Sequence, residues 1–226
     1  MLGNDVAGDC VSVTWANFRR LVTATLTAHT LYPNQNQVWQ FYETQNPKFN
    51  PNGTNTTNGP GSSADGGMDI QTALEELHAN GGPDGAKIFA FASVNVKNPA
   101  ECKAAIAACG ALWTGINVYD NNFTDFSNEQ PWQFIPGTGL DGGHSVLTGG
   151  YGSSVGLPTS LSGDEKFITW ADETSFTDNY WTNAVEEGWA VIWPEQLGTR
   201  SFEQGVSLNL LAQAYQQVTG QQLVIP

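Results

Sequence analysis

Two residues, Cys10 and His144, stand in sequence settings that favour nucleophilic catalysis. Cys10 follows the polar stretch GNDVAGD and precedes an apolar run, so we expect it at the first position of a helix. Unpaired backbone N–H groups there favour a thiolate and predict a thiol pKa below the free value of about 8.5. His144 lies in DGGHSVLTGGYG, behind two glycines and at the expected start of a strand. An imidazolium beside the sulfur would lower the thiol pKa further, and such an ion pair is a ready nucleophile.

The other histidines and cysteines fit structural roles. His29 and His78 stand near the ends of expected helices, where the negative end of the helix dipole favours an imidazole. Cys102 and Cys109 are seven residues apart on an expected helix, about 10 Å along its axis, which is too far for a disulfide. We expect both to be small buried residues.

Periodicity predicts an α+β protein in which helices come first and antiparallel strands follow. The expected helices span 10–28, 34–45, 70–80, 99–109 and 177–187, followed by a C-terminal helix that carries Leu208, Leu211, Tyr215 and Val218. The expected strands span 86–94, 111–119, 144–151, 165–171 and 188–193. We expect a single domain, with a helical lobe over about 1–88 and a mainly β lobe with a terminal helix over about 89–226.

Four segments resemble the papain-like cysteine peptidases in their order and spacing: GDCVSVTWANF, DGGMDIQTALEELHANGG, NPAECKAAIAACGALWTGINVY and GGHSVLTGGYG. The resemblance covers about residues 3–193, and GNDVAGDC is also similar to papain-like domains of phages and bacteria. It implies a two-lobed fold, in which a long central helix opens on the nucleophile Cys10 and an antiparallel β lobe carries the base His144.

The same resemblance assigns two residues around this pair, and the glycines before His144 indicate a third. Asn4 stands six residues before the cysteine, where the family has a glutamine that donates to the oxyanion. Gly67 matches a glycine whose main chain hydrogen-bonds the substrate in that family. Gly143 has no side chain, so the backbone of a substrate can approach it closely.

Two positions depart from the family pattern. Val11 replaces the tryptophan that follows the family's cysteine, and the asparagine that orients the histidine is missing from KFITWADETSF. Strand alternation would place Ile168, Trp170 and Asp172 on one face of this segment. Trp170 would then shield the imidazole and Asp172 would orient it, although Asp172 fits a solvated turn equally well.

These features predict a thiol-dependent hydrolase of peptide bonds that works through an acyl-enzyme. Transglutaminase-like acyl transfer and cell-wall amide hydrolysis use the same pair of residues and stay open. So does a papain-like scaffold without activity that serves as a structural or binding module, because a fold does not by itself imply a function. The expected partner of the enzyme is a peptide or protein substrate.

Composition excludes other classes of partner. The chain has 8 basic and 22 acidic residues, a formal net charge of −14, which repels nucleic acid and anionic membranes. No apolar run is long enough for a membrane span, and no signal peptide opens the sequence. Metal-ligand spacings, a P-loop and a dinucleotide motif are missing, so we expect no cofactor. Localisation and oligomeric state are left open by the sequence.

Overall fold

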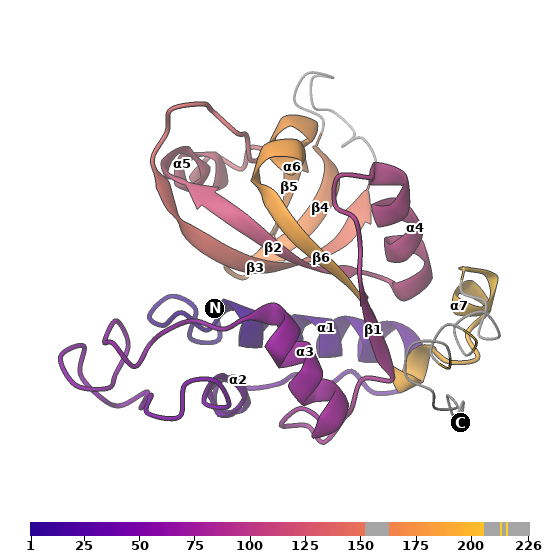
Figure 1. The fold of residues 1–226 in the computed structure, drawn as a ribbon, viewed down its shortest axis with the longest axis horizontal. Helices are drawn as coiled ribbons and strands as arrows, with labels where there is room; N and C mark the ends of the chain where they lie inside the picture. The colour runs from indigo at the N-terminus through magenta and orange to yellow at the C-terminus, as the bar shows by residue number, and fades with distance from the viewer. Residues whose placement is uncertain (152–162, 206–212, 214–215, 217–226) are drawn as a thin grey trace.

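An antiparallel sheet of six strands, in the order β1-β6-β2-β3-β4-β5, organises the computed structural model (Figure 1). The structure describes residues 1–151 and 163–205 together with residues 213 and 216. The strands are β1 (Ala90–Ser93), β2 (Leu112–Tyr119), β3 (Leu140–Tyr151), β4 (Gly163–Thr169), β5 (Asp172–Thr177) and β6 (Val185–Ile192). The fold is therefore α+β, as the sequence predicts.

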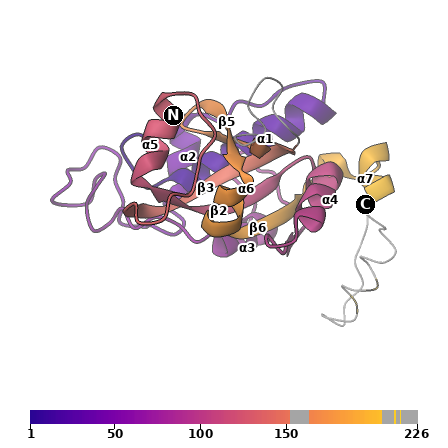
Figure 2. The same cartoon turned by 90° about the horizontal axis from the view of Figure 1, so that it is seen from above.

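Helices cover both faces of this sheet. They are α1 (Cys10–Leu26), α2 (Gln35–Tyr42), α3 (Ile70–Ala79), α4 (Pro99–Cys109), α5 (Asp120–Ser127), α6 (Asp178–Ala184) and α7 (Arg200–Gly205). Figure 1 shows α1, α2 and α3 on one side of the sheet and α5 and α6 on the other. Seen from above in Figure 2, α7 lies at the end of the molecule opposite the N-terminus.

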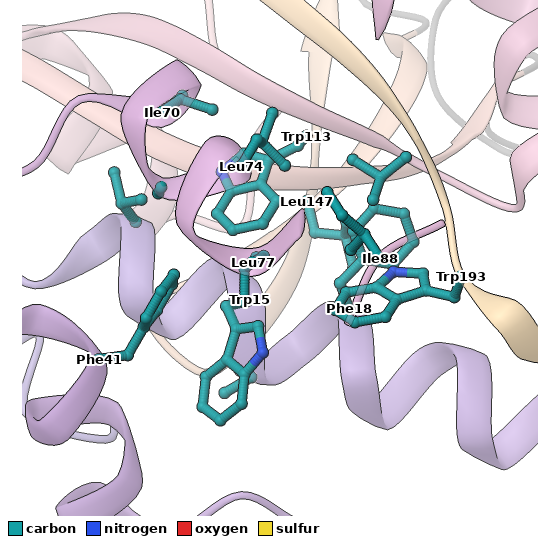
Figure 3. Packing of buried hydrophobic residues seen from close by; sticks show 14 of the residues in the cluster. Trp15, Phe18, Phe41, Ile70, Leu74, Leu77, Ile88, Trp113, Leu147 and Trp193 are labelled. Atoms are coloured by element: carbon teal, nitrogen blue, oxygen red, sulfur yellow. The ribbon is translucent and has the colours of Figure 1, made fainter. Parts of the chain in front are cut away.

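The alternation of side chains along the central strands builds a separate core on each face. Trp113 of β2 and Leu147 of β3 belong to the core beneath the sheet, where they pack with Trp15 and Leu74 of the helices (Figure 3). Their neighbours in sequence, including Val146, point to the opposite face and pack in the second core. Because both faces of β2 and β3 are buried, the register of these strands is fixed by packing.

The region after β3 differs most from the sequence prediction. The strand expected over 165–171 ends at Thr169, and the chain reverses through Trp170 (φ 45°) and Ala171 (φ 68°) into β5. Left-handed φ at both central residues is typical of a two-residue hairpin, which normally carries Asn or Gly. Because Trp and Ala give no such signal, the sequence did not reveal β5.

Three smaller differences concern boundaries. The helix expected over 177–187 ends at Ala184, because the next residues pair with β2 as the start of β6. Strand β3 begins at Leu140 rather than at His144, and α5 was not expected. The four residues that define the expected C-terminal helix, Leu208, Leu211, Tyr215 and Val218, lie outside the described part of the chain.

Candidate active site

The N-terminus of α1 presents backbone donors to the Cys10 sulfur. Cys10 is the first residue of the helix, as predicted, and the N-cap residue Asp9 makes no side-chain capping bond. The backbone of Ser145 in β3 and the backbone groups of Val11 and Cys10 lie close enough to the sulfur to act on it, and each lowers the pKa of the thiol. Because Ser145 directly follows His144, this contact brings the sulfur to the strand that carries the histidine.

A buried chain of hydrogen bonds fixes α1 against the sheet at this point. Trp113 Nε1 donates to Ser145 Oγ at 2.8 Å, and Ser145 Oγ donates to Thr14 Oγ1 at 3.0 Å. Thr14 Oγ1 in turn donates to the backbone oxygen of Cys10 at 2.9 Å. All of these side chains are buried, so the position of Cys10 over β3 is set by bonds between distant parts of the sequence.

Four of the six predicted site residues line one cleft. The cleft has a volume of about 820 Å³, and its walls include Cys10 and Gly67 from one side and Gly143 and His144 from β3. The structure thus brings together a thiol and an imidazole that are far apart in the sequence. The cleft is large enough to admit a segment of extended peptide.

His144 is oriented by Thr169, which the sequence analysis missed. His144 Nε2 and Thr169 Oγ1 are 2.7 Å apart, and Thr169 is buried. The ring of Trp170 lies against the imidazole with 5.5 Å between the centroids. This contact uses Nε2 and leaves Nδ1 as the other ring nitrogen. Thr169 directly precedes Trp170, but a threonine differs from the asparagine that the family pattern suggested, so no motif marked it.

Asp172 and Asn4 line a second cavity, of about 470 Å³, together with Trp170. The alternation expected for Asp172 was wrong, because the turn at Trp170 and Ala171 places Asp172 on β5. Its Oδ1 accepts from the backbone N–H of Glu173 at 2.8 Å. Asn4 Nδ2 donates to Asp9 Oδ1 at 3.3 Å. The structure therefore does not bring these two residues into the cleft of Cys10 and His144.

The two glycines line the cleft in different ways. Gly67 has a left-handed φ of +74°, its N–H donates to Tyr42 Oη at 3.0 Å, and its carbonyl accepts from Asn46 Nδ2 at 2.7 Å. Of the hydrogen-bonding groups in the Gly67 backbone, only the second lone pair of the carbonyl oxygen is available to a ligand. Gly143 is exposed, and a Cβ built on it meets no atom within 4 Å, so the backbone beside His144 is open to a ligand.

Burial makes the resting pair neutral, contrary to the lowered thiol pKa that the helix N-terminus suggested. Burial raises the pKa of Cys10 to about 11, and the charge of Asp9 adds to this, although the three backbone N–H groups act in the opposite direction. Burial also lowers the pKa of His144 to about 4. Because removal from water penalises every charged form, desolvation outweighs the helix N-terminus here.

The rate of Cys10 alkylation by iodoacetamide should therefore rise steadily through neutral pH. A thiol pKa of about 11 means that the thiolate fraction increases about tenfold for each pH unit below that value. Mass spectrometry of Cys10 peptides after timed labelling between about pH 5 and pH 10 measures the profile. A rate that is already constant below pH 7 would contradict it and would indicate a thiolate–imidazolium pair.

Cys102 and Cys109 serve as internal references for that experiment. Both are buried and neither is in a disulfide, as the sequence predicts, and neither lines the cleft. Within the described ranges, no group of three His, Cys, Asp or Glu side chains could hold a metal ion. None of the helices described is long and apolar enough to cross a membrane.

Comparison with solved structures supports the fold. The chain is similar to the crystal structure of xylellain, a cysteine protease from Xylella fastidiosa, with a TM-score of 0.55 and 14% sequence identity. The match covers 82% of this chain and 80% of that chain. No protein-family model and no curated protein sequence matches the chain. The structural similarity to xylellain therefore shows that the chain has a cysteine-protease-like fold.

Proposed function

We propose that this protein is a papain-like thiol hydrolase that cleaves peptide bonds with Cys10 and His144. The observation that carries the proposal is that Cys10, at the first position of α1, and His144 of β3 line the same open cleft. The fold shared with a cysteine protease supports the same reaction class. The proposal includes a peptide as the substrate. It also includes a division into two lobes between about residues 88 and 89, because residues from both sides of this boundary line the cleft.

The neutral pair supports a mechanism in which proton transfer accompanies attack. With its proton on Nε2, donated to Thr169 Oγ1, His144 has a lone pair on Nδ1. As the Cys10 sulfur bonds to the substrate carbonyl carbon, Nδ1 takes the thiol proton. The C–N bond then breaks, and the same nitrogen returns the proton to the leaving amine. Water hydrolyses the thioester and restores the thiol.

The oxyanion that forms during attack needs donors near the sulfur. The backbone N–H of Cys10 is one donor, because it already points at this region from the start of α1. Asn4, the second donor expected from the sequence, binds Asp9 and lines the neighbouring cavity, so the proposed mechanism does not depend on it. A donor to the oxyanion contributes on the order of 3 kcal/mol to transition-state stabilisation.

Trapping of the acyl-enzyme tests the proposed function. The protein is mixed with a pool of peptides, quenched in acid within seconds and analysed by mass spectrometry for an acyl group on Cys10. A thioester on Cys10 that is lost in His144→Ala supports the proposal. Acyl groups on Cys102 or Cys109, or no acyl group and no cleaved peptide, would contradict it.

A binding module on the same scaffold is the second candidate, and the raised pKa of Cys10 favours it. Under that alternative the cleft holds a peptide without cleaving it, so the peptide is recovered intact from the mixture. Adding a primary amine to the trapping experiment separates hydrolysis from acyl transfer, because a transferase yields the amide of the added amine.

Replacing Thr169 tests the orientation of the base. We expect Thr169→Val to lower kcat by about tenfold with little change in KM, because it removes one hydrogen bond to the imidazole and keeps the side-chain volume. Thr169→Ser retains the hydroxyl and should keep most of the activity. Initial rates on a cleaved peptide measure both variants. Equal rates for Thr169→Val and the parent would show that this contact does not orient His144.

A further inference from the structure

The residues that line the cleft include acidic side chains that the proposed reaction does not use. Glu186 and Glu187 of β6 line the cleft, and Asp69 lines it at the start of α3. No Lys or Arg stands among the described residues around the cleft, and burial keeps His144 uncharged near neutral pH. The nucleophile therefore faces a cavity with three formal negative charges.

Glu187 is held in place by the sheet. It pairs with Gly115 of β2, and a Cβ on Gly115 would lie 2.7 Å from Glu187 Cγ and 2.8 Å from Oε1. The missing side chain at Gly115 thus makes the room that the carboxylate occupies. Trp189 Nε1 donates to Glu187 Oε2 at 2.6 Å and fixes the group from the other side. Glu187 is consequently a partly buried carboxylate with a defined position.

The hydrogen-bond partners of these carboxylates are neutral. Glu187 accepts from an indole, Glu186 Oε1 accepts from Asn117 Nδ2 at 2.8 Å, and Asp69 Oδ1 accepts from the backbone N–H of Thr72 at 2.7 Å. Such donors satisfy oxygen lone pairs but leave the negative charge in place. A cationic ligand group would be attracted to this charge, and an anionic one would be repelled.

The strand register sets the distance between this charge and the reacting atoms. Glu187, Gly115 and Ser145 stand in one row across β6, β2 and β3. Two strand spacings amount to about 10 Å, and Ser145 lines the cleft together with Cys10. At about 3.3 Å per residue, a side chain two or three residues from the scissile bond reaches Glu187.

We propose that the cleft selects peptides with an arginine or lysine side chain, which binds against Glu187 with support from Glu186. This inference rests on the proposed function for the identity of the ligand as a peptide. It concerns binding, however, so it can be tested without turnover. Arginine fits best, because its planar guanidinium can donate to a carboxylate oxygen and to neighbouring carbonyls together.

The test uses the full chain with Cys10→Ala, which binds peptides without reacting. Dansyl-labelled pentapeptides, Gly-Gly-Xaa-Gly-Gly, carry arginine, its neutral isostere citrulline, or glutamate at the central position, and fluorescence titration gives each Kd. We expect the arginine peptide to bind about tenfold more tightly than the citrulline peptide, with the glutamate peptide weakest. Raising the salt concentration should shrink this preference.

Further substitutions in the Cys10→Ala protein show which carboxylate produces the preference for arginine over citrulline. Glu187→Gln keeps the shape and the acceptor for Trp189 and should reduce the arginine preference to about twofold. Glu186→Gln, which changes an exposed residue, should reduce it less. Glu203→Gln on α7 makes the same charge change at the opposite end of the molecule and should leave the ratio unchanged (Figures 1 and 2).

Failure of this inference differs from failure of the proposed function. Equal Kd values for the arginine and citrulline peptides would overturn the charge preference, and so would a preference that persists in Glu187→Gln. A protein that binds arginine peptides selectively but never forms a thioester would support the charge preference and contradict the proposed hydrolysis. If Glu187→Gln does not fold, the Kd values of the arginine and citrulline peptides for the Cys10→Ala protein still test the charge preference.

Discussion

Cys10→Ala should abolish peptide cleavage while leaving the fold intact. The sulfur forms the covalent bond to the substrate in the proposed reaction, and alanine has no group that can replace it. We expect a loss of at least about 10⁴-fold in kcat/KM, which is typical when a covalent nucleophile is removed. Initial rates of peptide cleavage and a thermal unfolding curve of the same preparation measure activity and folding together.

Cys102→Ala provides the matched control, because it removes a thiol that is buried in the sheet's other core. It should lower stability by leaving a small cavity, but it should retain activity at temperatures where it is folded. Cleavage that survives in Cys10→Ala would show that another group performs the reaction and would remove the basis of the proposed mechanism.

Asp9→Asn should stabilise the protein as pH rises toward neutrality. Asp9 is fully buried, its Oδ2 has no hydrogen-bond partner among the described residues, and burial raises its pKa from 3.8 to about 7. Nearby Asp65 and Asp5 act in the same direction. Between these two pKa values the unfolded chain releases the proton while the folded chain keeps it, so folding becomes less favourable as pH rises.

The size of the stabilisation by Asp9→Asn follows from the shift in the pKa of Asp9. The cost of ionising Asp9 is absent below about pH 4 and complete above about pH 7, where it amounts to about 4 kcal/mol. Asparagine keeps the shape and never ionises. The difference in unfolding free energy between Asp9→Asn and the parent, measured by urea denaturation from about pH 4 to pH 8, should therefore grow with pH by this order.

Comparison of variants isolates the contribution of Asp9. The lowered pKa of His144 makes the folded state less stable as pH falls from 6.5 toward 4. His144 contributes equally to the pH dependence of the parent and of Asp9→Asn, so its contribution cancels in the difference between their unfolding free energies. Asp5→Asn removes an exposed carboxylate nearby and serves as the control for the loss of one acidic side chain. A flat difference for Asp9→Asn would mean that burial does not raise the pKa of Asp9.

Local signals were sufficient for the elements that carry the site. The change from GNDVAGD to an apolar run predicted the start of α1 at Cys10, and α3 begins at Ile70, as expected, with Asp69 as its N-cap. Runs rich in β-branched and aromatic residues predicted β2 and most of β3. The turn into β5 escaped prediction because Trp170 and Ala171 adopt a conformation that their own side chains disfavour.

The sequence by itself determined the α+β class, the helix that begins at Cys10 and the strand that holds His144, because these depend on spacing and on local capping. Only the tertiary structure decided which groups meet there. It placed Thr169 rather than Asp172 on His144, turned Asn4 toward Asp9, and made Cys10 and His144 neutral. Such properties arise from burial and from hydrogen bonds between distant segments, which no local pattern contains.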